Sequence, residues 1–281
     1  MNEFLRVLFD SPAALLDDLV LRSLVALVFA AILGGVTGSF VVAKRMTSVA
    51  GAISHAALGG VGIAYFLGAD PLLGALAVAV LSAGFIASAY LRHDASLDSL
   101  LSVTWSLGMS VGIIALSISP GYQPGLEQYL FGNVFLVSRE YLFYLVAITT
   151  ATVILVAMFF PHLQAISFDE EFADIRGIGL KRYFCLLMLL VCISVVLLIQ
   201  VVGIVLVIAL LSLPASASIK ASIGLKQLIF LSCVISVVCS LAGFFVSWLA
   251  DAHYMLSLPV GPVIVVVAVL AFLGSRVFRS V

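Results

Sequence analysis

His55 is the only histidine near the middle of a long apolar stretch, in the segment GAISHAALGGVG. On a helix, Gly51, His55, Gly59 and Gly62 would share one face, so the imidazole would project from a surface that has few other side chains. Ionisable groups at membrane depth are costly and usually face a cavity or a partner. We predict that His55 is a transient metal ligand or lines a translocation path, with the three glycines forming a small-residue cavity face. The alternative is a hydrogen-bonded histidine packed among glycines.

A second candidate for metal chemistry is the pair Asp251 and His253, which lies in the segment Asp-Ala-His-Tyr. An imidazole beside a carboxylate suits a divalent first-row ion. An ordinary polar loop would have the same composition, so both interpretations stay open. The four cysteines all lie inside apolar runs and form no C-x-x-C pair, which predicts neither a disulfide framework nor a thiolate metal site.

Residues 167–182 form a charged island. They contain four acidic and three basic residues, seven of the 27 charged residues in the chain. Ser167 and Glu170 match the S-x-x-E capping box, which predicts that a helix begins there. Gly177 predicts its end. We therefore expect a short helix over about residues 167–180.

One face of this island helix would be apolar, because Phe168, Phe172 and Ile175 recur at i, i+4 and i+7. Acidic side chains would cover the opposite face. This pattern predicts an amphipathic helix on the membrane surface, with a partner outside the membrane. A solvated loop helix is the alternative.

The chain as a whole is 64% hydrophobic and 10% charged, with a mean hydropathy of +1.30. This composition excludes a soluble globular fold and predicts an all-α, polytopic transmembrane bundle in one domain, residues 1–281. Residues 3–18 are predicted to lie at the membrane interface, and the aromatics of 119–140 to form an interfacial belt or a docking surface. Runs long enough to cross a bilayer occur at about 20–43, 49–68, 71–91, 98–118, 141–160, 183–213, 227–250 and 258–275.

The run 183–213 is too long for one untilted crossing and short for two. One crossing would place six Lys and Arg residues inside and seven outside, whereas folding back near Gln200 to Gly203 would place ten inside and three outside. Basic residues favour the cytoplasmic side. We therefore predict a broken or hairpin segment near the bundle centre, giving 8 to 9 membrane segments, with one long helix as the alternative.

Some functions are excluded by missing motifs. The chain has no G-x-x-x-x-G-K-[ST] phosphate loop and no H-E-x-x-H motif. Few carboxylates lie at membrane depth, which disfavours a proton relay. An energy source would have to come from another subunit, and no nucleic-acid partner is expected.

Five segments together resemble the membrane permease subunits of bacterial metal-ion ABC importers, the ABC-3 family that transports zinc, manganese or iron. These segments occur in the family's order and are Gly38–Met46, Ser54–Gly60, Tyr129–Gly132, Phe168–Ala173 with Gly177–Gly179, and Val201–Ala215. The resemblance implies a type II ABC importer permease fold in the bacterial cytoplasmic membrane. It implies no stably bound cofactor, with the metal ion as cargo.

The resemblance also implies partners and roles. These are a cytoplasmic ATP-binding subunit, an extracytoplasmic metal-binding protein, a second permease copy and the lipid bilayer. The island would be the coupling helix, contacting the ATPase through Phe168, Asp169, Phe172, Ala173 and Gly177. The family commonly has aspartate at the positions of Gly51 and Ser257, so a weak, His55-centred or water-mediated passage is expected. Alternatives are a siderophore or cobalamin permease, an ATPase-independent secondary transporter, and a membrane enzyme.

Overall fold

The computed structural model describes residues 18–92, 96–119, 131–132, 134–254, 256 and 258–277. Ser257, nearly all of segment 3–18 and most of segment 119–140 lie outside these residues. The described residues are helical and carry no strand. Their elements are α3 Asp18–Ala43, α4 Thr47–Leu67, α5 Pro71–Arg92, α6 Leu97–Ile118, η1 Val134–Leu136, α8 Arg139–Met158, α9 Phe160–Phe168, α10 Glu170–Ile175, α11 Leu180–Ser218, α12 Leu225–Tyr254 and α13 Val260–Val277.

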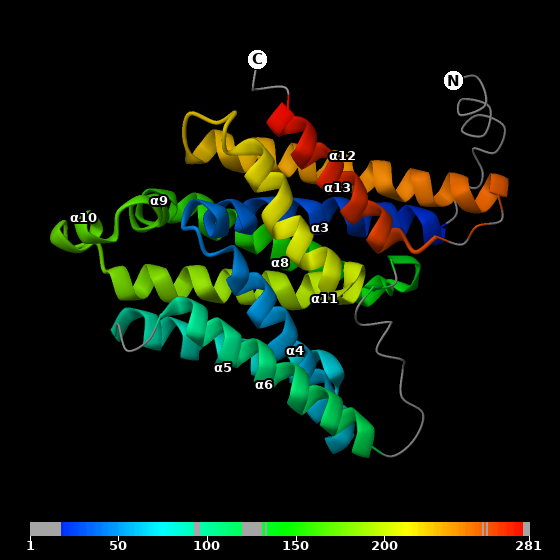
Figure 1. The fold of residues 1–281 in the computed structure, drawn as a ribbon, viewed down its shortest axis with the longest axis horizontal. Helices are drawn as coiled ribbons and strands as arrows, with labels where there is room; N and C mark the ends of the chain where they lie inside the picture. Colours follow the sequence, from blue (N-terminus) through cyan, green and yellow to red (C-terminus); the bar gives the residue numbers. More distant parts are fainter. Residues whose placement is uncertain are drawn as a thin grey trace.

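The helices form one elongated bundle (Figure 1). Within the described residues, seven helices are long and apolar enough to cross a membrane, and Val260–Arg276 is a shorter apolar helix. Each of the eight predicted apolar runs coincides with one of these helices, which confirms the all-α, polytopic fold. The most apolar stretches of α4 and α11 are 83% and 78% buried, whereas those of α5 and α8 are each 28% buried. The first pair therefore forms the interior, and the second pair lies at the periphery of the bundle.

α11 is interrupted at Gly203, where φ is 79° and ψ is 164°. In Figure 1 the part of α11 after this break turns back across the bundle. The predicted break is therefore confirmed, and it is buried as expected. It lies beside Gly132, and the preceding Val202 lies beside Gly261. The reversal brings the end of α11 back to the α3–α4 turn and α9, with which it lines one cavity.

Gly203 has a backbone conformation that only glycine adopts readily, at an expected strain of about 1–3 kcal/mol for any other residue. Gly203→Ala should therefore lower the melting temperature of the detergent-solubilised protein by several degrees, because the reversal of α11 would be strained. A matched control is Gly84→Ala in α5, where an added Cβ would meet no atom within 4 Å. Equal melting temperatures for the two variants would contradict the predicted strain.

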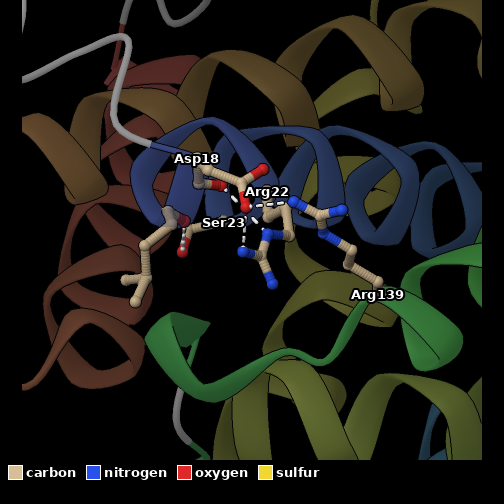
Figure 2. A network of polar contacts seen from close by, with 5 residues as sticks. Asp18, Arg22, Ser23 and Arg139 are labelled. Carbon is tan, nitrogen blue, oxygen red and sulfur yellow. Dashed lines mark hydrogen bonds and ion pairs between the residues drawn. The ribbon is translucent and has the colours of Figure 1, made fainter.

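At the end of α3 away from the α3–α4 turn, Asp18 joins α3 to α8 (Figure 2). Its carboxylate accepts hydrogen bonds from Arg22 one turn further along α3 and from Arg139 Nη2, the latter at 2.6 Å. These charged groups are partly exposed, and exposed ion pairs contribute little to stability. The buried Ser23 hydroxyl also donates to the carbonyl oxygen of Val134 at 3.1 Å, which holds η1 against α3.

Candidate functional site

His55 lies in the interior on α4, with 8% of its surface exposed. Its ring stacks on that of Trp105 from α6, with the centroids 4.2 Å apart and the planes 20° from parallel. Its Nδ1 has no hydrogen-bond partner among the described residues. Buried polar atoms in folded proteins are nearly always paired, so an unpaired imidazole nitrogen is a candidate for binding a ligand.

A cavity of about 370 Å³ opens beside His55. Its other walls come from α11 after the break, namely Ile204, Val205, Ile208, Ala209, Ser212 and Leu213. The Ser212 hydroxyl donates to the carbonyl oxygen of Ile208 at 2.6 Å, which engages its proton and leaves its oxygen as an acceptor. The imidazole is the side chain in this lining that has a polar atom without any hydrogen-bond partner among the described residues. The prediction that His55 faces a cavity is confirmed.

None of the three glycines of the predicted face lines this cavity. A Cβ at Gly51 would lie 3.1 Å from the Trp105 ring, so this glycine makes room for the stacked aromatic. A Cβ at Gly59 would lie 2.8 Å from the Gly108 carbonyl oxygen, and one at Gly62 would lie 2.4 Å from that of Gly112. These two glycines allow the backbones of α4 and α6 to touch. The cavity-face prediction is therefore wrong for all three glycines: Gly51 accommodates the Trp105 ring, and Gly59 and Gly62 allow close helix packing.

Asp251 and His253 are not brought to His55. Both are exposed near the end of α12, and Asp251 lines a separate cavity of about 300 Å³ with Trp248 and Gly261. The two cavities share no lining residue. Within the described residues, no group of three or more His, Cys, Asp or Glu side chains could hold a metal ion. A tightly coordinated ion is therefore not built from this part of the chain.

The charged island comprises the last two residues of α9, all of α10 and the start of α11, with a corner at Asp169. Asp169 is extended and its Oδ1 accepts a hydrogen bond from the Phe172 amide at 2.9 Å, so it is the N-cap of α10. Ser167 lies in α9 instead, and its hydroxyl donates to the Leu163 carbonyl. The capping box predicted for Ser167 is therefore wrong, because a carboxylate two residues later provides the cap. The predicted end near Gly177 is confirmed by its φ of 70°.

The island presents an apolar surface. Phe168, Phe172 and Ile175 are 63%, 48% and 86% exposed, and Asp169 and Gly177 are also exposed. Ala173 is completely buried. The prediction that Ala173 belongs to a contact surface is therefore wrong, because its methyl group anchors α10 to the bundle. We call Phe172 and Ile175 of α10, together with Phe168 at the end of α9, the α10 apolar face.

Trp105 was not predicted as a site residue. Its only signal in the sequence is its rarity, since the chain has two tryptophans. Its place beside His55 depends on how α6 packs on α4, and spacing within one helix does not specify that.

Comparison with known proteins places the chain among transport proteins. The model of the ABC 3 transport family matches residues 16–279. A Chlamydia trachomatis protein named "Probable metal transport system membrane protein" is 34% identical over 259 residues, which cover 90% of this chain and 86% of that protein. The manganese transport system membrane protein MntC of Halalkalibacterium halodurans is 32% identical over 177 residues, covering 62% of this chain and 60% of MntC. A chain of PsaBC from Streptococcus pneumoniae, solved in complex with Fab, superimposes with a TM-score of 0.82 at 29% identity, covering 98% of this chain and 94% of that chain.

Proposed function

The chain belongs to the ABC 3 transport family, and we propose that it is the membrane permease subunit of an ATP-driven importer for divalent transition-metal ions. It is a multi-pass integral protein of the bacterial inner membrane. We propose that it acts as a transport subunit and that a separate subunit hydrolyses ATP. The observation that carries the proposal is the family match over nearly the whole chain. The structure agrees with it, since a cavity within the membrane-spanning bundle and an exposed apolar helix at one end are what a coupled permease needs.

The proposed cargo is zinc, manganese or ferrous iron. Relatives named for metal or manganese transport support this cargo class. The cavity beside His55 supplies one imidazole and mostly apolar walls, so a passing ion would keep most of its water. Binding would then be weak, which allows release on the other side. We propose that the metal is cargo only, that no cofactor is stably bound, and that Asp251 and His253 contribute at the outer end of the path.

Three protein partners are proposed. A cytoplasmic ATP-binding subunit would bind the α10 apolar face together with Asp169 and Gly177, because exposed phenylalanines on a short helix outside the bilayer need a protein cover. An extracytoplasmic metal-binding protein would dock on the side of Asp18 and Arg139. A second permease copy, identical or related, would complete the path.

The test is uptake of radioactive manganese or zinc into proteoliposomes that contain the permease, its ATP-binding subunit and its binding protein. We expect uptake that needs ATP and that stops when the ATP-binding subunit is omitted. Uptake that persists without that subunit would instead indicate a secondary transporter. Uptake of a metal chelate but not of the free ion would indicate a siderophore-type permease.

A further inference from the structure

Glu170, the first residue of α10, joins the island to the ends of membrane helices. Its Oε1 lies 2.5 Å from Lys44 Nζ, and it accepts a hydrogen bond from the Tyr90 hydroxyl at 3.2 Å. The Lys44 ammonium also donates to the Ile166 carbonyl oxygen of α9 at 2.7 Å. The Lys44 side chain is only 3% exposed and that of Glu170 is 28% exposed. This is a largely buried charge pair, in contrast to the exposed pairs of Asp18.

An aromatic ring completes the cluster. The Phe184 side chain is fully buried at the start of α11, and the Lys44 ammonium lies 5.2 Å from its ring centroid. The Tyr90 ring stacks on Phe184 with the centroids 5.0 Å apart. One carboxylate of α10 is thus connected to the turn after α3, the end of α5 and the start of α11. We call Lys44, Tyr90, Glu170 and Phe184 the Glu170 cluster.

The elements joined by this cluster lead to the His55 cavity. Lys44 lies in the short turn that precedes α4, the helix that carries His55. Phe184 lies near the start of α11, whose residues after the break at Gly203 form the other walls of that cavity. A displacement at Glu170 would therefore act on both sides of the cavity at once.

Apart from the buried Ala173 and the contacts of Glu170, the side chains of α10 are exposed. Glu170 lines two cavities, of about 520 Å³ and 470 Å³, on the same side of the bundle. Among the residues of α10, only Ala173 is fully buried. Since open space adjoins Glu170 in two directions, its polar contacts are the firm attachment of the first turn of α10 to the membrane helices.

We propose that the Glu170 cluster is the mechanical link that transmits movement of α10 to α4 and α11, with Glu170 as a positioning residue for transport. This inference rests on the proposed function. It adds the route by which movement driven by ATP hydrolysis would be transmitted to the cavity. A buried lysine without its counter-charge is strongly disfavoured. Lys44 is therefore expected to follow Glu170 when a partner moves α10.

The experiment measures metal ions transported per ATP hydrolysed by the complete complex in proteoliposomes. Glu170→Gln keeps the size of the side chain and one oxygen acceptor but removes the charge that holds Lys44. We expect it to lower this ratio about fivefold, the lower end of typical coupling effects, while ATP hydrolysis and co-purification of the ATP-binding subunit persist. The matched control is Glu171→Gln, which removes the same charge from an exposed neighbour on the same turn and should leave the ratio unchanged.

Lys44→Met should lower the ratio similarly, and the double variant should be no worse than the more affected single variant, because residues that act as one unit are not additive. A ratio for Glu170→Gln equal to that of Glu171→Gln would overturn the inference. A parallel fall in transport and hydrolysis at an unchanged ratio would also overturn it, since it would indicate a merely structural pair. If the unaltered complex showed no ATP-driven uptake, the proposed function itself would fail, and this inference with it.

Discussion

Replacing Phe172 with aspartate should release the ATP-binding subunit from the complex while the permease itself stays folded. Phe172 is 48% exposed on α10, between Phe168 and Ile175. Loss of a central aromatic side chain from an interface costs about 2–4 kcal/mol, which weakens binding roughly 30- to 700-fold. A carboxylate placed in an apolar contact adds a desolvation penalty. Co-purification of the two subunits from detergent is the measurement.

The permease is expected to tolerate this substitution. The contribution of Phe172 to the capping of α10 is its backbone amide, which bonds to Asp169 and is unchanged by a new side chain. The Arg176 guanidinium, now 5.1 Å from the Phe172 ring centroid, could pair with the introduced carboxylate at i,i+4 spacing. Elution as a single species from size-exclusion chromatography would verify that the variant is folded.

Ile223→Asp is the matched control for Phe172→Asp. Ile223 is 98% exposed between α11 and α12, on the same side of the bundle but outside the α10 apolar face. This variant should keep the ATP-binding subunit. Retention of the subunit by both variants would show that α10 is not the binding surface, and loss from both would show that the surface is wider than α10.

The membrane helices could be predicted from sequence because few backbone structures other than a helix are stable in lipid. Every backbone polar group must be satisfied within a segment, so each long apolar run becomes a helix. The break in α11 could also be predicted, because run length and the distribution of Lys and Arg were inconsistent with a single crossing. The residues that enclose it could not, since the contact of Gly203 with Gly132 depends on tertiary packing.

In the charged island, residue spacing alone did not predict the helix boundaries or the contacts of Glu170. Ser167 and Glu170 matched a capping box, yet α9 continues through Phe168 and Asp169 caps the next helix. Glu170 was therefore assigned to a local cap when its carboxylate in fact contacts Lys44, more than a hundred positions earlier in the chain. Local spacing identifies helix ends but gives no information about such long-range pairs.

The His55 cavity combines a prediction that succeeded with one that failed. A lone histidine in an apolar helix was singled out by the cost of burying it. The same reasoning could not divide the neighbouring glycines between a cavity and the surface of α6, because both need small residues. Only the positions of Gly108 and Gly112 distinguish these roles.

Replacing His55 with alanine should slow metal transport about tenfold or more, which corresponds to about 1.4 kcal/mol in the transport barrier. His55 is the one side chain in the cavity lining with an unpaired polar atom, so removing it leaves an ion facing apolar walls and the already paired Ser212. The Ser212 hydroxyl oxygen would then be the remaining polar side-chain atom that an ion meets there. The rate of ATP-driven uptake at saturating metal-loaded binding protein is the measurement, and co-purification of the ATP-binding subunit should not change.

Two further variants separate the role of the imidazole nitrogen from that of packing. Ser212→Ala removes the other polar side chain of the same cavity and should transport normally, because that hydroxyl is engaged within its own helix. Trp105→Ala removes the stacked ring and leaves the imidazole in place. If His55 acts as a ligand, His55→Ala should be the slower of the two. If Trp105→Ala is equally slow, the stack rather than the nitrogen shapes the path, and unchanged uptake by His55→Ala would remove His55 from the path altogether.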